Sequence, residues 1–324
     1  MNSYLHVSDK MDDCLYSNIS AVVSNWCSID FEMIGADAWG FEFAELNPIK
    51  SSNNIEYIWD RVHAYHKDSW KSLEIYYGVK VTWNYTKTYR ETLSLIYKEL
   101  AEKRPILVYI NSHFCPWHPR QDEYNMHFCL VVGIDKDNEG LLCVDPSLNV
   151  QKGFLPLTLF SEGWGPCITF LKSSEQCRNI SWQEIVSNAL DRLWSGDGIN
   201  ESSFNSMRRL SNELDDEINN SPDKIPLWVE NPIPVVISVN LLQKGRIYFS
   251  IALKHLAERY DNHDLLPIAN RLSQAAKKWN SISFMVYKAK SNHGDYNTLI
   301  KIPQKICEIA KFEEEIAFDL MRSL

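Results

Sequence analysis

Three residues of the sequence carry the side chains that an activated nucleophile, its base and an orienting group require. They are a thiol at Cys14, an imidazole at His127 and a carboxylate at Asp145. A thiolate attacks acyl carbon atoms, a neighbouring imidazole moves the proton, and a carboxylate fixes the tautomer of the imidazole. Each residue alone has an ordinary structural explanation. Together, they predict nucleophilic acyl transfer if the fold brings them into contact.

Cys14 is expected at the start of a helix. Asp12 and Asp13 precede it, and both are favourable N-cap or first-turn residues. The apolar residues that follow recur with the spacing of one helix face, at positions 15, 19, 22, 23 and 26. The positive end of a helix dipole favours a thiolate over a thiol, so this position suits a nucleophile.

His127 and Asp145 are expected on one β-hairpin. Apolar strands are predicted at 128–134 and 140–144, and a polar turn at 135–139 joins them. His127 opens the first strand and Asp145 closes the second, so their side chains should meet across the ladder. The carboxylate then accepts from one imidazole nitrogen and leaves the other nitrogen for the thiol.

The surrounding chain predicts an α+β fold of two domains. Residues 1–175 combine an antiparallel sheet with a few helices, and residues 176–324 are mainly helical. Further elements expected in the first domain are strands at 79–83, 106–110 and 165–171, a helix at 89–103, and a loop followed by a strand at 35–43. The helices expected in the second domain lie at 182–193, 204–218, 245–260, 265–289 and 296–321. Residues 232–239 are expected to be a lone strand or an extended crossing, and Pro303 should kink the last helix or confine its start.

Composition narrows the class of protein. A net charge of −9 disfavours nucleic-acid binding, and no window approaches the roughly 20 apolar residues of a membrane span. The polar segment 1–10 has no signal-peptide pattern, so we expect a cytoplasmic protein without membrane partners. In that compartment cysteines such as Cys129 and Cys143 are expected as small buried hydrophobic residues. The acidic run 313–315 is expected on a solvated helix face.

These residues also resemble a known family. The segments Asp13-Cys14-Leu15, 35–43, 111–124, and 127–135 with Val144-Asp145 resemble the N-terminal domain of the family named for butirosin biosynthesis protein H. The resemblance spans roughly residues 12–172. It implies a papain-like cysteine-enzyme domain that transfers an acyl group from a carrier protein's phosphopantetheine thioester to an amine.

The resemblance also implies roles and partners. Cys14 would hold the acyl group, His127 would shuttle protons and Asp145 would orient His127. The partners would be an acyl or peptidyl carrier protein, which brings the phosphopantetheine, and a small-molecule amine acceptor or an internal nucleophile. The chain itself would need no cofactor, and its setting would be natural-product biosynthesis. In the loop 111–124 the substrate-binding candidates are Asn111, Phe114, Trp117 and Tyr124. Its aromatic residues could equally pack in the core.

One departure bears on the reaction. Papain-like peptidases place a Gln shortly before the Cys to stabilise the oxyanion, and residues 7–13 contain none. The donors would be the backbone N–H of Cys14 and a second group that the sequence does not identify. This favours an already activated thioester over a peptide bond as substrate. A cysteine hydrolase and a non-catalytic binding module remain as alternatives.

Two other clusters have weaker functional interpretations. The residues His113, Cys115, His118 and His127 could suggest zinc, but their spacing does not match the usual paired-ligand patterns, so no metal is expected. The basic pairs Arg208-Arg209 and Lys244 with Arg246 are expected on solvated helix surface. Their alternative role is a docking patch for an acidic carrier protein.

Overall fold

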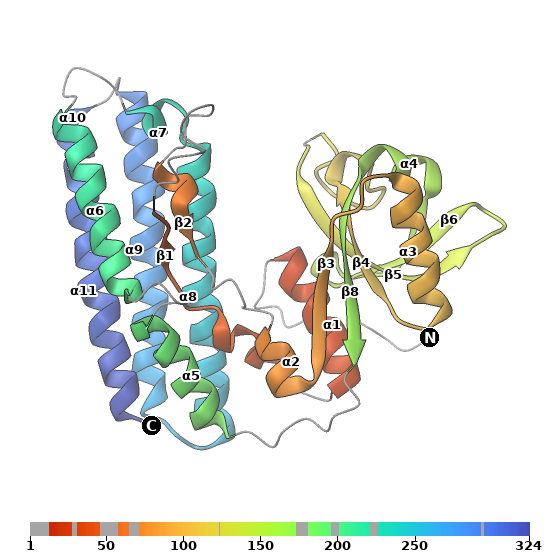
Figure 1. Cartoon of the computed structure of the whole chain (residues 1–324), viewed down its shortest axis with the longest axis horizontal. Helices are drawn as coiled ribbons and strands as arrows, with labels where there is room; N and C mark the ends of the chain where they lie inside the picture. The colour runs from red at the N-terminus through yellow and green to blue at the C-terminus, as the bar shows by residue number, and fades with distance from the viewer. Residues whose placement is uncertain are drawn as a thin grey trace. The chain divides into compact units, whose positions relative to one another are not determined.

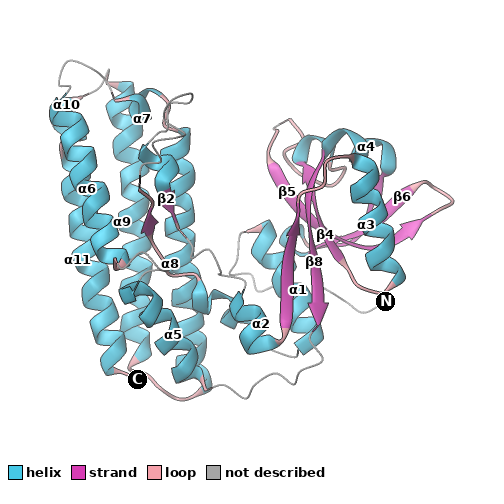
Figure 2. Cartoon of the chain, viewed as in Figure 1, coloured by secondary structure: helices cyan, strands magenta, loops and turns pink. Residues whose placement is uncertain are grey.

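The computed structural model describes residues 13–27, 31–45, 58–64, 71–122, 124–172, 181–195, 201–220, 226–292 and 295–324. The chain forms two compact units, Met1–Ile34 with Trp70–Asn179, and Gly35–Ser69 with Ile180–Leu324. Strands form the centre of the first unit and helices dominate the second (Figure 1, Figure 2). The later boundary falls close to the expected residue 175. The described residues 35–45 and 58–64 were expected with the sheet, and this expectation is wrong, because they belong to the helical unit.

The first unit is built on a six-stranded antiparallel sheet of order β3-β8-β4-β5-β6-β7. The strands are β3 Val79–Asn84, β4 Ile106–Asn111, β5 Met126–Asp135, β6 Gly140–Asp145, β7 Val150–Pro156 and β8 Trp164–Lys172. Five of the six lie within two residues of their predicted bounds. Strand β7 was not predicted, because it is an edge strand that contains Gly153 and exposed polar residues and so lacks a continuous apolar pattern.

Helices cover both faces of this sheet. The helices are α1 Cys14–Cys27, α2 Lys71–Tyr77, α3 Tyr89–Ala101 and α4 Leu157–Gly163, with 3-10 turns η3 Ser112–Phe114 and η4 Pro146–Leu148. Trp26 of α1 packs against Phe170 of β8, whereas Ile96 of α3 packs with Ile106 and Val108 of β4. Ile106 pairs with Thr169, the neighbour of Phe170, and strand side chains alternate between faces. Helices α1 and α3 therefore lie on opposite faces of the sheet.

The second unit is a helical bundle with one small ladder. Its helices are α5 Trp182–Ser195, α6 Ser203–Asn220, α7 Leu227–Glu230, α8 Ile233–Arg259, α9 Leu265–Ser291, α10 Tyr296–Leu299 and α11 Lys301–Arg322. The ladder pairs β1 Glu42–Phe43 with β2 Val62–His63, and η1 Phe31–Asp37 and η2 Ile58–Arg61 flank it. The strand considered for 232–239 is wrong: α8 begins at Ile233, since prolines are tolerated at the start of a helix. Pro303 lies in the first turn of α11, which confirms that it confines the helix start.

A buried ion pair fixes the segment around Trp39 in this bundle. Arg246 and Glu313 are both fully buried and are joined by hydrogen bonds of 2.9 and 2.8 Å. Glu313 also accepts from the indole nitrogens of Trp39 at 2.8 Å and Trp279 at 2.7 Å, and Arg246 donates to the carbonyl oxygen of Gly40 at 2.8 Å. The expected solvent exposure of Glu313 and Arg246 is therefore wrong. These bonds explain why residues near 40 belong to the helical unit.

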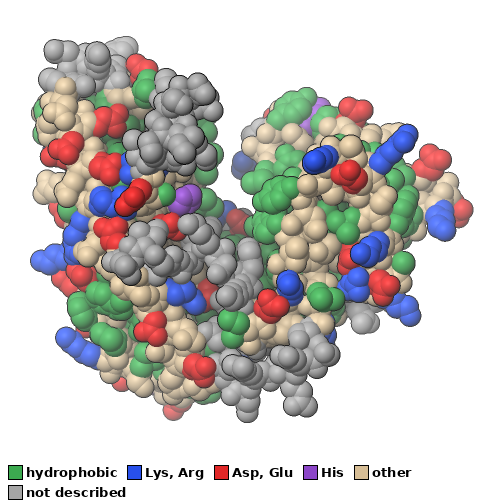
Figure 3. Space-filling model, viewed as in Figure 1, with side chains coloured by type: hydrophobic (Ala, Val, Ile, Leu, Met, Phe, Trp, Pro, Cys, Tyr) green, Lys and Arg blue, Asp and Glu red, His purple; other side chains and the backbone are tan. Residues whose placement is uncertain are grey.

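The other basic pair is also engaged within the unit. Arg208 is paired with Glu314, and Arg209 is paired with Glu201 at 3.0 Å. Figure 3 shows acidic and basic side chains interspersed over the helical unit on the face in view. Arg208 and Arg209 therefore do not form a free positive docking patch. None of the helices in the described ranges is both long enough and apolar enough to span a bilayer.

Candidate active site

Helix α1 begins at Cys14, as expected, and Asp13 caps it. The Asp13 carboxylate accepts from the backbone N–H groups of Leu15 at 2.9 Å and Tyr16 at 3.2 Å. These bonds satisfy two of the amide groups that a helix start leaves without a partner. Cys14 therefore lies in the first turn, and its side chain is partly exposed. Asp12, the other expected capping residue, lies outside the described residues.

Asn18 ties the helix that bears Cys14 to the strand that bears His127. Its side-chain nitrogen donates to the carbonyl oxygen of Cys14 at 2.6 Å and to that of Phe128 at 2.9 Å. Phe128 directly follows His127 on β5. Because Asn18 is fully buried, the two bonds form without competition from water and hold the first turn of α1 against the start of β5.

His127 and Asp145 form a buried hydrogen bond across the hairpin. The Nε2 atom of His127 lies 2.6 Å from Oδ2 of Asp145, and the two residues are 3% and 0% exposed. In the register of β5 and β6, Leu130 pairs with Val144, so the His127 side chain reaches Asp145 diagonally. Since Nε2 is engaged by the carboxylate, Nδ1 remains for another partner.

Two further side chains hold Asp145. Its Oδ1 accepts from the hydroxyl of Ser147 at 2.7 Å, and Oδ2 also accepts from the indole nitrogen of Trp117 at 2.9 Å. Burial acts to raise the pKa of this carboxyl, but the bonds from His127, Ser147 and Trp117 and the charge of His127 outweigh it and lower the pKa. Asp145 is therefore an ionised, fixed acceptor for the imidazole.

Cys14 also interacts with His127, and the interaction affects the pKa of the imidazole. Burial is the largest single influence on the pKa of His127 and lowers it. Hydrogen bonds to Asp145 and Cys14 and the charges of both groups act in the opposite direction, and together they raise the pKa to about 9. An imidazole held between a carboxylate and a thiol is the arrangement that activates a cysteine nucleophile. The structure thus brings together all three residues proposed from the sequence.

The four substrate-binding candidates have different surroundings. Asn111 ends β4, and its side-chain oxygen caps η3 by accepting from the N–H of His113 at 3.0 Å. Phe114 packs against the sheet core, whereas Tyr124 is 69% exposed and stacks on His113. The indole nitrogen of Trp117 donates to Asp145, so this atom holds the carboxylate. Substrate contact by these residues stays a prediction.

Four other described cysteines are buried, whereas Cys27 and Cys307 are partly exposed like Cys14. Cys129 and Cys143 are buried in the sheet core, as expected. Burial raises the pKa of Cys115 to about 12, with a further contribution from the charge of Asp145, and burial raises that of Cys167 to about 11. These thiols stay protonated near neutral pH and are poor nucleophiles. Cys177 lies outside the described residues.

Sequence reasoning did not assign Asn18, Ser147 or His118 to the site. A polar residue one turn after Cys14 on the buried helix face was the available signal for Asn18. Ser147 follows Asp145 by two residues, and its hydroxyl donates to Oδ1 of Asp145. The ring of His118 packs on that of His127 with centroids 4.7 Å apart. Its position in the loop gave no indication of this contact.

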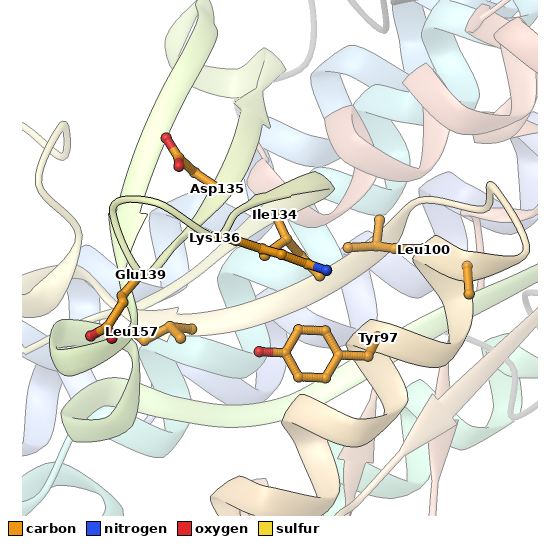
Figure 4. Close-up of a pocket in the computed structure, with 8 residues that line it drawn as sticks. Tyr97, Leu100, Ile134, Asp135, Lys136, Glu139 and Leu157 are labelled. Atoms are coloured by element: carbon orange, nitrogen blue, oxygen red, sulfur yellow. The ribbon is translucent and has the colours of Figure 1, made fainter.

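The remaining features of the described residues concern metal-ligand groups and hollows away from Cys14, His127 and Asp145. Within the described ranges, no three His, Cys, Asp or Glu side chains are grouped as metal ligands would be. A hollow of about 770 Å³ lies between the end of α3 and the β5–β6 turn, at the opposite end of β5 from His127. Figure 4 shows Tyr97 and Lys136 among the side chains that line it.

Two comparisons with known proteins gave no match. No protein-family model matches the chain, and a search of curated proteins gave no significant match. The assignment of a function therefore depends on the chemistry of the site.

Proposed function

We propose that the chain is a cysteine-dependent acyltransferase that moves an acyl or aminoacyl group from a carrier-protein thioester, through Cys14, to an amine or an internal nucleophile. The observation that carries the proposal is that buried His127 is hydrogen-bonded to Asp145 and interacts with Cys14, which contributes to its raised pKa. The carrier protein, its phosphopantetheine and the setting in natural-product biosynthesis come from the family resemblance of the sequence.

The first half of the reaction loads the enzyme. The Cys14 thiolate attacks the carbonyl carbon of the donor thioester, and the carbon–sulfur bond of the donor breaks. The departing thiolate takes the proton of the His127 imidazolium, which leaves His127 neutral and the acyl group on Cys14. Exchange of one thioester for another is nearly neutral in free energy, so this step needs less oxyanion stabilisation than attack on a peptide bond.

The second half discharges the enzyme. A neutral amine attacks the acyl carbon, and His127 removes a proton from its nitrogen. The bond between the acyl carbon and Cys14 then breaks, which restores the thiolate beside an imidazolium. Asp145 stays ionised throughout, since its bonds from Trp117 and Ser147 do not depend on the proton of His127. Water could take the place of the amine, which would make the same residues a hydrolase.

A partition experiment tests the proposal against these alternatives. The enzyme is mixed with octanoyl- and glycyl-pantetheine carrying a radiolabelled acyl group and with a panel of primary amines. The proposal predicts label in amide products, none with Cys14→Ala, and unchanged yield with Cys27→Ala, which alters the thiol at the other end of α1. Label only in free acid supports the hydrolase. A wild-type enzyme that consumes no thioester, and whose Cys14 alkylates no faster than a free thiol, supports a binding module.

A further inference from the structure

His118 has a fixed position beside the catalytic histidine. It lies in the loop that follows η3, next to Trp117, and its half-buried ring meets that of His127 edge to face with an interplanar angle of 62°. His118 therefore lies against a side chain that interacts with both Cys14 and Asp145. No step of the reaction described above assigns it a role.

The hydrogen bonding of His118 defines which of its nitrogens carries a proton. The backbone N–H of Arg120 donates to Nδ1 of His118 at 3.1 Å. A nitrogen that accepts a hydrogen bond bears no proton, so the neutral ring carries its proton on Nε2. Burial and the positive charge of His127 lower the pKa of His118, which keeps it neutral near pH 7. In the described part of the chain, Nε2 has no hydrogen-bond acceptor.

The reaction needs a second hydrogen-bond donor at the acyl oxygen. Attack on the thioester places a negative charge on that oxygen, and a helix start offers the backbone N–H of Cys14 as one donor. Among the described residues, two neighbouring side-chain donors are engaged elsewhere, since Trp117 donates to Asp145 and Asn18 donates to two carbonyl oxygens. The amide of Gln121 also donates to two carbonyl oxygens, those of Cys115 and Pro116.

We propose that the Nε2–H of His118 donates to the oxygen of the acyl group while Cys14 is acylated and deacylated. This inference rests on the proposed acyl transfer and supplies a donor in place of the Gln that residues 7–13 lack. A neutral imidazole is suited to this role, because it polarises a carbonyl oxygen without transferring a proton to it. Because the His118 ring is neutral, it also places no second positive charge beside the His127 imidazolium.

Two reactions of Cys14 separate this role from a structural one. Alkylation by iodoacetamide develops no oxyanion, whereas acylation by p-nitrophenyl acetate does. We expect His118→Ala to slow acylation about 10²-fold, the usual effect of losing one oxyanion donor, while the alkylation rate stays within twofold of wild type. His118→Gln, which keeps an N–H donor, should recover at least tenfold of the lost rate. His113→Ala, a change at an exposed histidine of the same loop, should alter neither rate.

The possible outcomes have distinct meanings. Equal acylation rates for wild type and His118→Ala would overturn the inference and leave acyl transfer through Cys14 intact. Equal losses in alkylation and acylation would also overturn it, because His118 would then act by positioning His127. If wild-type Cys14 alkylates rapidly but is never acylated above the Cys14→Ala background, the proposed acyl transfer fails and the inference falls with it.

Discussion

Asn18 and Phe128 are joined by a 2.9 Å hydrogen bond from the buried side-chain amide of Asn18 to the backbone carbonyl oxygen of Phe128. The same amide nitrogen holds the carbonyl oxygen of Cys14. The nucleophile and the base come from separate elements of the fold, and this one side chain fixes the distance between them. The precision of the site therefore depends on a residue that takes no part in the chemistry.

Asn18→Ala should impair the site more than its loss of stability explains. The buried carbonyl oxygen of Phe128 and the partly buried one of Cys14 lose their shared donor, so the free energy of unfolding should fall by about 1–3 kcal/mol. The alkylation rate of Cys14 should fall about tenfold or more, because Cys14 and His127 are no longer held together. The control is Ser20→Ala on the same helix, since the buried hydroxyl of Ser20 has no partner among the described residues. Equal alkylation rates in the two variants would contradict this positioning role.

The ionisation of His127 should be measurable directly. NMR titration of its imidazole should give a pKa of about 9, because the bonds and charges of Asp145 and Cys14 outweigh the effect of burial. The pKa should fall in Cys14→Ala and in Asp145→Asn, each of which removes one of these partners, and should not change in Cys27→Ala. A wild-type pKa below 6.5 would show that burial dominates.

The same ionisation should make stability depend on pH. The folded pKa of His127, about 9, lies above the ordinary value of 6.5, so the folded state holds the proton more tightly than the unfolded state. The stabilisation is fully present below pH 6.5 and is lost as the pH rises through about 9. Its size is at most about 3 kcal/mol. Urea unfolding at pH 6 and pH 9.5 should show this loss in wild type and a smaller one in His127→Gln.

Asp145 and Trp117 should affect activity in graded steps. Asp145→Asn keeps the shape but removes the charge that stabilises the imidazolium, so acylation should fall about 10²-fold, the low end of the range for acid–base catalysis. Trp117→Phe removes one hydrogen bond to Asp145 and should cost less than tenfold. Both should retain more activity than Cys14→Ala in the same acylation assay. A Trp117→Phe loss as large as that of Asp145→Asn would mean that Trp117 contacts the substrate directly.

The buried ion pair predicts a large stability effect without a catalytic one. Glu313→Ala leaves Arg246 and two indole nitrogens buried without their acceptor, so the helical unit should lose about 3–5 kcal/mol. Glu315→Ala is the control, because Glu315 is 52% exposed and its ion pair with Arg271 should contribute less than about 1 kcal/mol. Denaturant unfolding followed by circular dichroism measures both. Equal effects would contradict the burial of the Arg246–Glu313 pair.

The sequence predicted those parts of the fold that depend on near neighbours. The start of α1 is predicted by Asp13, whose carboxylate caps the helix by accepting from the N–H of Leu15. The β5–β6 hairpin is predicted by two apolar runs on either side of a polar turn. The assignment of residues 35–45 to the helical unit could not be predicted in this way. Trp39 is held there by Glu313, which is 274 positions away, and no local pattern reports such a bond.

The candidate site follows the same division. Residue types and hairpin geometry were enough to select Cys14, His127 and Asp145. The residues that hold them were missed or given another role, because their partners are distant in sequence: Asn18 and Phe128 are 110 positions apart, and Trp117 and Asp145 are 28 apart. An indole in an aromatic loop indicates a pocket wall or core packing equally well. Only the fold reveals that it donates to the carboxylate.

The central claim is that Cys14 carries the acyl group as a covalent thioester, and intact-protein mass spectrometry tests it most directly. The enzyme is mixed with octanoyl-pantetheine without an acceptor, quenched in acid and weighed. The account predicts one added acyl mass that is absent in Cys14→Ala, present in Cys27→Ala and lost when an accepted amine is added. The free energy of unfolding of Cys14→Ala should lie within about 1 kcal/mol of the wild-type value, since the Cys14 side chain is partly exposed. An unmodified wild-type mass during turnover, or an adduct that survives in Cys14→Ala, would contradict the claim.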